Sequence, residues 1–305
     1  MADISDILQT SCQVKLLDLG VVRVTGNYVE KFLQGQLTCD VREINENQHR
    51  LGAHCDVKGR VHVTFYLFLH QEAYYFLLPQ SMIPHLLLCL TKYAVFSKAC
   101  VVDVSQDWQV TGLIGPEISD ILAQNHLLPH PNTTVASFKT IISLAVTGTT
   151  PRFILLAPNE QSISFLNNKT LQEGVMSNWH LLDIIAGIPT IYPKTIGQFT
   201  PHQLNYPAIN GVSFNKGCYI GQEIIARTHY LGVSKSRLYN LAFQANTNFP
   251  AGTPIQTSDG STQGTLIMAA NEKNDSFQAL ACLQMQAVSH TIWLESPQGP
   301  PIWLL

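Results

Sequence analysis

Residues Gly211–Arg227 read GVSFNKGCYIGQEIIAR, and the interpretation of the whole chain starts from this stretch. Two glycines, Gly217 and Gly221, enclose a short polar loop that runs into a predicted helix at Glu223–His229. Glycine permits left-handed backbone angles and close approach between backbone segments. The free backbone N–H groups at a helix start favour an anion or a carboxylate. The stretch therefore predicts a tight loop leading into a helix that begins beside a polar site.

One thiol in this loop, that of Cys218, is a candidate for chemistry. Cys218 follows Lys216 and precedes the helix start, and a nearby cation and a helix N-terminus both lower the pKa of a thiol. The alternative is an inert residue packed beneath the loop, as most free cysteines are. A phosphate-binding loop is excluded, because that motif carries its lysine after the second glycine, whereas here the lysine precedes Gly217. We assign Cys218 and Lys216 as candidate catalytic residues.

The eight residues Lys216–Glu223 (KGCYIGQE) resemble the signature K-G-C-Y-x-G-Q-E of the YgfZ proteins, which are relatives of the glycine-cleavage T-protein. The resemblance implies an α+β, T-protein (aminomethyltransferase)-like multidomain fold around a central cavity that binds tetrahydrofolate or a one-carbon derivative. Four further stretches resemble the same family in the same order: Phe32–Val41, Gly52–Arg60, Lys92–Lys98 and Trp179–Pro189.

The resemblance also implies which residues contact the folate. Trp179 matches a tryptophan that the family places at the folate pocket, although an isolated tryptophan is more often a core residue. A second family tryptophan aligns with Gly20 or its neighbours, where this chain has no aromatic residue. Further contacts are expected from the signature and from two loops, at Tyr219, Gly221, Gln222, Glu223, Arg227, Asn205 and Lys58.

The function implied by the resemblance is that of an accessory protein. It would bind tetrahydrofolate and, through the Lys/Cys loop, support the assembly or repair of iron–sulfur clusters and thereby tRNA modification. Its transient partners would be iron–sulfur proteins or assembly factors. Two alternatives stay open. One is a folate-dependent aminomethyl-type transferase, for which the sequence offers no aspartate with an assignable role. The other is a scaffold of the same fold that binds no ligand.

Length, amino-acid composition and net charge limit the domain organisation and the possible partners. The 305 residues exceed one ordinary core and predict two or three compact units. Hydrophobic residues make up 46% and charged residues 13%, so the chain can bury enough apolar surface to stay ordered. A net charge of −3 provides no overall basic face of the kind that nucleic-acid binding normally uses, so no direct nucleic-acid binding is expected. A local basic surface formed by Lys216, Arg227, Lys235 and Arg237 stays open. The family resemblance suggests a monomer.

Cysteine and histidine spacing predicts neither disulfides nor a metal. The seven cysteines are odd in number and form no C-x-x-C pair, as expected of a chain in the reducing cytoplasm. The histidines show no metal-binding spacing such as H-x-x-x-H. The opening MADISDILQT lacks the features of a signal peptide, and no apolar run is long enough for a membrane span.

Periodicity predicts the main elements. Val14–Val24 alternates like one strand, Leu51–His70 resembles a hairpin with a polar turn, and Trp179–Ala186 resembles a helix. A boundary near Leu231–Ser234 separates an α+β region at 1–230, formed of two interleaved subdomains, from a β-barrel domain at 231–305. The barrel strands are expected at Leu238–Phe243, Thr262–Met268, Ala279–Met285 and Thr291–Leu294.

Overall fold

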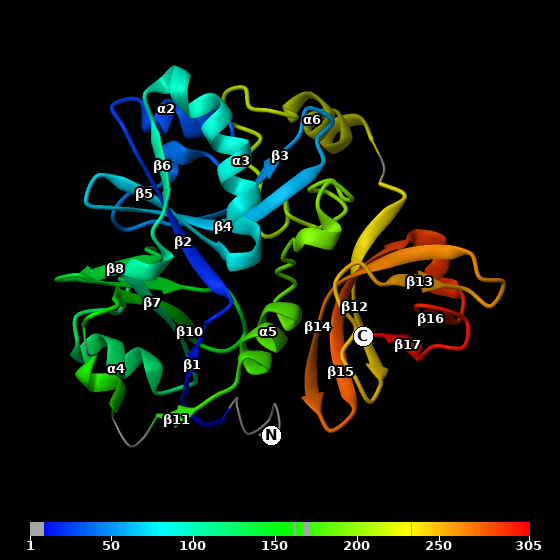
Figure 1. The fold of residues 1–305 in the computed structure, drawn as a ribbon. Coiled ribbons are helices and arrows are strands. Elements are labelled where there is room, and N and C mark those ends of the chain that lie inside the picture. Colours follow the sequence, from blue (N-terminus) through cyan, green and yellow to red (C-terminus); the bar gives the residue numbers. More distant parts are fainter. Residues whose placement is uncertain (1–8, 162, 168–170, 233) are drawn as a thin grey trace.

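The architecture consists of two β-sheets that lie one above the other and a β-barrel beside them (Figure 1). The computed structural model describes residues 9–161, 163–167, 171–232 and 234–305. Val233 and the opening residues 1–8 thus lie outside the described residues, and so does part of the predicted domain boundary. The predicted α+β fold with a C-terminal antiparallel barrel is confirmed.

The first sheet has five strands in the order β3-β4-β5-β2-β6. Its strands are β2 (Leu19–Thr25), β3 (Arg50–Cys55), β4 (Val61–His70), β5 (Ala73–Pro79) and β6 (Cys100–Asp103). The second sheet has six strands in the order β11-β1-β7-β10-β9-β8. Its strands are β1 (Cys12–Lys15), β7 (Trp108–Ile114), β8 (Val135–Phe138), β9 (Ile141–Ala145), β10 (Arg152–Pro158) and β11 (Gln172–Glu173).

The barrel closes in the order β12-β15-β14-β13-β16-β17. Its strands are β12 (Ser236–Gln244), β13 (Pro254–Gln256), β14 (Thr262–Lys273), β15 (Ser276–Gln284), β16 (Ile292–Leu294) and β17 (Pro301–Leu304). The α-helices are α2 (Val29–Gln34), α3 (Ile83–Ala94), α4 (Ile118–Gln124), α5 (Met176–Ile185) and α6 (Gln222–Leu231).

The prediction of one continuous strand at Val14–Val24 is wrong. The chain turns at Leu16–Asp18, so that β1 pairs with β7 in the six-stranded sheet while β2 pairs with β5 in the other. Both halves alternate between apolar and polar residues, and alternation reports burial on one face without reporting which sheet a strand joins. The turn carries Asp18 between the two sheets, where its backbone carbonyl accepts a hydrogen bond from the Gln80 N–H at 2.7 Å.

The core runs on both sides of the five-stranded sheet. Every residue of β5 is buried, and its side chains alternate between two hydrophobic clusters. Phe76 and Leu78 pack on the side of α2 and α3, whereas Tyr75 and Leu77 pack against the six-stranded sheet. A strand buried on both faces loses the alternation of a surface strand and becomes continuously apolar.

Helix α5 packs against the outer face of the barrel and so joins the barrel to the core of the α+β region. Leu181 and Ile184 of this helix share one hydrophobic cluster with Ile267, Met268 and Leu280 of the barrel strands. The backbone carbonyl of Ile184 also accepts a hydrogen bond from the Asn240 side chain at 3.2 Å. The outer face of the barrel is therefore part of the main core rather than a separate surface. Among the described residues, no helix combines the length and apolar character that a membrane span requires.

Candidate functional site

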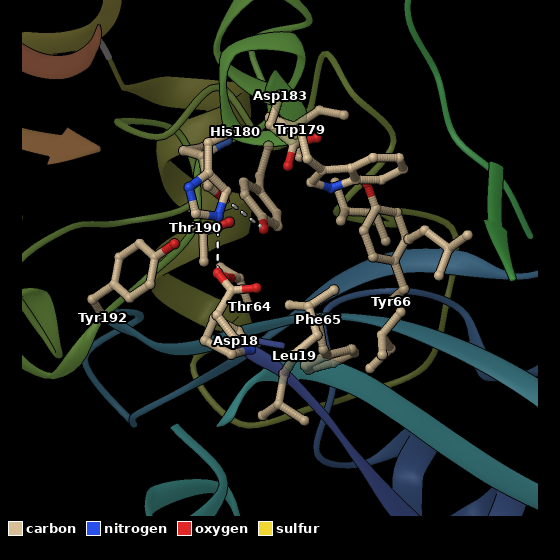
Figure 2. A pocket seen from close by; sticks show the side chains of 18 residues that line it. Asp18, Leu19, Thr64, Phe65, Tyr66, Trp179, His180, Asp183, Thr190 and Tyr192 are labelled. Carbon is tan, nitrogen blue, oxygen red and sulfur yellow. Dashed lines mark hydrogen bonds and ion pairs between the residues drawn. The ribbon is translucent and has the colours of Figure 1, made fainter. Parts of the chain in front are cut away.

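A cavity of about 50 Å³ lies at the junction of the two sheets and α5 (Figure 2). Aromatic side chains form much of its wall, and Figure 2 shows Trp179 and Tyr66 on one side and Tyr192 on the other. Trp179 is 4% exposed and lies against Gly112, whose missing side chain leaves the space that the indole fills. Trp179 therefore lines a cavity between the two sheets, and its contact with a folate stays a prediction.

An aspartate–histidine pair stands at the edge of this cavity. The His180 imidazole, on α5, lies 2.8 Å from the Asp18 carboxylate at the turn between the two sheets (Figure 2). Burial of His180 opposes its protonation, but the hydrogen bond and the charge of Asp18 outweigh this penalty, so the pKa of His180 is raised. The pair can therefore hold a proton beside a bound ligand.

A second charge pair lies deeper. The Arg152 guanidinium, 1% exposed, donates to the Asp183 carboxylate at 2.7 Å and lies over the Trp179 ring at 5.2 Å. Burial raises the pKa of Asp183, although the neighbouring Arg152 favours its ionised form. The pair fixes the orientation of α5 against the six-stranded sheet, because a buried charge without its partner is costly. Asp183 itself also lines the cavity.

Two oxygen atoms at the cavity have no partner within the described residues. These are Asp18 Oδ1 and the Tyr66 hydroxyl, and both atoms are inaccessible to solvent. Burial raises the pKa of Tyr66, so the hydroxyl keeps its proton and can donate or accept. A buried polar atom without a hydrogen bond is destabilising by roughly 1–3 kcal/mol, so such atoms at a cavity wall favour a polar occupant, either water or a ligand group.

A larger hollow of about 480 Å³ opens beside the cavity. Asp18, His180 and Tyr192 line both spaces, and Phe249 and Met268 of the C-terminal region line the far side of the hollow. The aspartate–histidine pair and Tyr192 thus stand between a small interior cavity and a wider opening next to the barrel.

The signature loop lies against the first sheet. Lys216 is 7% exposed, and its ammonium donates to the backbone carbonyls of Leu37 and Cys39, each at 2.7 Å. The same ammonium lies 4.9 Å from the centre of the Tyr219 ring, which is also buried. Burial lowers the pKa of Lys216 to about 8. Lys216 therefore anchors the loop to the interior, which the sequence analysis did not anticipate.

Cys218 lies between these two buried residues and is itself exposed. The side chains of Lys216 and Tyr219 are buried, whereas the Cys218 thiol between them lies on the protein surface. The prediction that Cys218 is accessible for chemistry agrees with this placement, and the alternative of a thiol packed beneath the loop does not. Its chemical role stays a prediction.

The remaining signature residues connect the loop to the turn of the β3–β4 hairpin. Gly221 adopts a φ of +83° before α6, and a Cβ at this position would clash with the Asp56 carbonyl oxygen. Gln222 and Glu223 form the first turn of α6, and the exposed Arg227 follows on the same helix. The hairpin turn carries Lys58, which is also exposed.

The predicted folate contacts therefore divide between separate places. Trp179 lines the cavity, whereas Asn205 lines a different groove of about 560 Å³ with His202, His229 and Arg237. The residues found to line the cavity do not include Tyr219, Gly221, Gln222, Glu223, Arg227 or Lys58. These six are placed on the signature loop, α6 and the hairpin turn, and their contact with a folate stays a prediction.

The second family tryptophan, expected at Gly20 or its neighbours, has no room at Gly20. A Cβ on Gly20 would lie 2.5 Å from the Ile83 side chain and 2.6 Å from the Ser105 hydroxyl oxygen, so no large residue fits there. Leu19, the residue before it, lines the cavity instead. Sequence reasoning missed Asp18, His180 and Tyr66. Asp18 is a polar residue at the break between two strands and His180 lies in the first half of α5, whereas Tyr66 lies within β4 and offers no sequence signal.

Comparison with solved structures defines the class of protein. The chain superposes on the glycine cleavage system aminomethyltransferase T from Bartonella henselae with a TM-score of 0.77 over 98% of this chain and 86% of that one, at 14% identity. It therefore has the T-protein fold. A scan against protein-family models finds no match.

Curated relatives narrow the class to one family. The chain is 34% identical to the tRNA-modifying protein YgfZ of Colwellia psychrerythraea over 81% of its own length and 76% of the relative. It is 38% identical to the protein of the same name from Hamiltonella defensa over 76% of its length and 70% of the relative. The chain belongs to the YgfZ family.

Proposed function

We propose that the chain binds tetrahydrofolate, or a one-carbon derivative of it, in the cavity between the two sheets and α5. The observation that carries this proposal is an aromatic wall containing two unpartnered oxygens, Asp18 Oδ1 and the Tyr66 hydroxyl. A reduced pterin offers a flat apolar face and several N–H donors, and both oxygens can accept hydrogen bonds from such donors. Trp179 supplies a ring edge or face against the pterin.

The small volume of the cavity means that side chains must move before a folate can enter. A cavity of about 50 Å³ holds water but not a bicyclic ring, so binding requires the side chains at its edge to move. His180 and Tyr192 stand between the cavity and the hollow of about 480 Å³. Their displacement would let the pterin reach Trp179 while the rest of the folate lies in the hollow beside the barrel.

The second part of the proposal concerns Cys218. With folate bound, the chain would assist the assembly or repair of iron–sulfur clusters in partner proteins of the cytoplasm, including those on which tRNA modification depends. The support is an exposed thiol on a loop that Lys216 anchors to the interior. Exposed apolar side chains on the neighbouring hairpin turn and α6, those of Val57 and Ile224, favour contact with a protein partner.

Folate binding is tested by calorimetric titration of reduced tetrahydrofolate into the wild-type chain and Tyr66→Phe. Tyr66→Phe should weaken binding by about tenfold, because one ligand hydrogen bond is lost. The same change should leave the unliganded chain equally or more stable to urea, because it removes a buried hydroxyl without a partner.

Two matched variants make this test specific. Trp179→Phe should also weaken binding, whereas Trp303→Phe, on the half-exposed last strand, should leave it unchanged. Tyr206→Phe removes a hydroxyl that donates to the Pro189 carbonyl at 3.3 Å and should destabilise the chain, in contrast to Tyr66→Phe. Equal affinity in the wild type and in all variants would show that folate does not bind in this cavity, and no binding by the wild type would refute folate binding altogether.

The role of Cys218 is tested in cells that lack the gene. Cys218→Ala should fail to restore the activity of iron–sulfur enzymes under oxidative stress, while the purified variant still binds folate. Cys100→Ala, which removes the other exposed thiol, is the matched control and should restore activity fully. Full complementation by Cys218→Ala would remove the thiol from the proposal and leave folate binding intact.

One observation favours a second candidate function, a folate-dependent one-carbon transfer. Asp18 and Asp183 place two carboxylates at the cavity, and His180 can hold a proton beside them. Turnover of a one-carbon folate by the purified chain, lost in Asp18→Asn, would support this reading. If the folate binds but is not consumed with or without partner proteins, the accessory function is the one that remains.

A further inference from the structure

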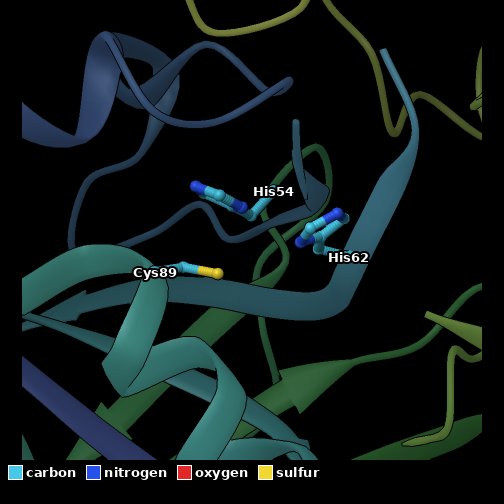
Figure 3. A group of neighbouring side chains, drawn as sticks. All are labelled: His54, His62 and Cys89. Carbon is cyan, nitrogen blue, oxygen red and sulfur yellow. The ribbon is translucent and has the colours of Figure 1, made fainter. Parts of the chain in front are cut away.

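Three nitrogen- or sulfur-bearing side chains gather at the end of the β3–β4 hairpin, away from the cavity. His54 comes from β3, His62 from β4 and Cys89 from α3, and one potential ligand atom of each lies within 4.8 Å of the others (Figure 3). A β-bulge in the pairing of these strands lies between His54 and Cys55. His54 pairs with Val63 and Cys55 with Val61, so His62 is the extra residue of the bulge. In a regular ladder His62 would pair with Cys55 and face the side opposite to His54, whereas the bulge allows both imidazoles to lie on one side.

His54 has a buried polar side chain for which the described residues supply no hydrogen-bond partner. The side chain is 5% exposed, and neither ring nitrogen has a hydrogen-bond partner among the described residues. An uncharged imidazole has one ring nitrogen with a free lone pair, and neither nitrogen of His54 uses it within the described residues. A buried imidazole without partners is destabilising, whereas the same lone pair is what a metal ion requires.

The surroundings of His62 provide the supporting groups of a metal site. Its Nδ1 lies 3.1 Å from His85 Nε2, and its Nε2 lies 3.6 Å from the Asp56 carboxylate. His85 and Cys89 are four residues apart on α3 and therefore lie on the same face of the helix. A carboxylate on the second nitrogen of a ligating histidine fixes its orientation and raises its basicity.

We propose that His54, His62 and Cys89 bind a divalent cation of the Zn²⁺ class, with His85 positioned to complete a four-ligand set. Imidazole nitrogen and thiolate sulfur are the preferred ligands of Zn²⁺. Ligand atoms around tetrahedral Zn²⁺ are roughly 3–4 Å apart, given metal–ligand distances of about 2.0–2.3 Å, so the observed cluster needs only a small contraction.

Binding exchanges a proton for the metal. Without the cation, an ordinary thiol carries its proton at neutral pH. Coordination forms the sulfur–metal bond and releases that proton to solvent. Histidine spacing alone gave no metal signal, because His54 and His62 lie on separate strands and the four-residue spacing on α3 pairs His85 with a cysteine. The cation would tie α3 to the hairpin whose turn contacts the signature loop at Gly221.

The test is a titration of the reduced, chelator-treated full-length chain with Co²⁺, followed by displacement with Zn²⁺. One equivalent of Co²⁺ should produce a thiolate-to-cobalt charge-transfer band that Zn²⁺ abolishes. Cys89→Ser should lose the band and weaken Zn²⁺ binding by more than about 100-fold, because losing a ligand exceeds the effect of losing a supporting group. Cys218→Ser, which keeps all proposed ligands, is the control and should retain the band.

His54→Leu provides a second test, in which a loss of metal binding cannot be explained by a loss of folding. This variant should abolish Zn²⁺ binding while leaving the metal-free chain equally or more stable, because an apolar side chain replaces unpartnered nitrogens. Asp56→Asn should weaken Zn²⁺ binding by about 10-fold or more. Absence of the band in the wild type, its survival in Cys89→Ser, or its loss in Cys218→Ser would each overturn the proposal.

Discussion

Lys216 and Cys218 are two residues apart in the signature but face opposite environments. The Lys216 ammonium is buried on two backbone carbonyls, whereas the Cys218 thiol is exposed. The sequence grouped the two as one reactive pair because both belong to the same motif. At the residue scale, the Lys216 side chain anchors the loop to the interior, whereas the Cys218 side chain is exposed. The pH dependence of stability can detect the burial of the Lys216 ammonium.

Lys216 should give the stability of the chain a specific pH dependence. Its pKa falls from 10.5 to about 8 on folding, so between these values the unfolded chain binds more protons than the folded chain. Stability therefore rises with pH in this window. The free energy of unfolding of the wild type, measured relative to Lys216→Met by urea titration, should increase from pH 8 toward 10.5.

A flat or falling difference for Lys216→Met would mean that its ammonium is not desolvated in the folded chain.

The Asp18–His180 pair should have the opposite pH dependence. The pKa of His180 is raised on folding above its ordinary 6.5. The contribution of the pair is then fully present below pH 6.5 and is lost as the pH rises through the folded pKa. The stability advantage of the wild type over Asp18→Asn should accordingly shrink as the pH is raised, and NMR titration should show a lower His180 pKa in the variant.

Asp107→Asn, at an exposed carboxylate outside the cavity, should leave both quantities unchanged. An unaltered His180 pKa in Asp18→Asn would show that the carboxylate does not hold the imidazolium.

At the scale of elements, the contact between the signature loop and the hairpin turn depends on Gly221. Its φ of +83° and the clash of any added methyl group with the Asp56 carbonyl oxygen impose two distinct costs on a side chain. Gly260 has a φ of +79° but no atoms within 4 Å of its Cβ position, so it isolates the conformational cost.

Gly260→Ala should therefore destabilise the chain by about 1 kcal/mol, the cost of a left-handed alanine. Gly221→Ala should cost at least about 2 kcal/mol more, because the hairpin turn or the start of α6 must shift. Urea unfolding of both variants measures the difference. Equal effects at the two glycines would show that the close backbone contact has no energetic role.

At the scale of the whole molecule, the barrel is integrated into the core. Ile267, Met268 and Leu280 pack in the same hydrophobic cluster as Leu181 and Ile184 of α5. A chain truncated after Leu231 would expose this apolar face of α5, the helix whose other side packs Trp179 against the six-stranded sheet. The truncated chain should unfold at a lower temperature than the full chain, bind a hydrophobic dye and lose folate affinity.

The predicted division at residues 230 and 231 would, in contrast, suit two independently stable units. A truncated chain with the thermal transition and folate affinity of the full chain would support that division and contradict the shared core.

The sequence by itself determined the family, the α+β character, the C-terminal barrel and the presence of a loop before α6. These features depend on motifs and on periodicities that repeat within a few residues, such as the glycines at 217 and 221. It also identified Trp179 as a cavity residue through family resemblance. It could not show that Val14–Val24 divides between two sheets, because alternation is the same in both halves.

Only the tertiary structure decided which distant residues meet. Asp18 reaches His180 across 162 positions, and His54, His62 and Cys89 converge from two strands and a helix. The physical reason is that such contacts arise from the packing of sheets and helices, and packing brings together side chains whose separation along the chain carries no periodic signal. For the same reason, the burial of Lys216 beneath its own motif could not be read from the motif.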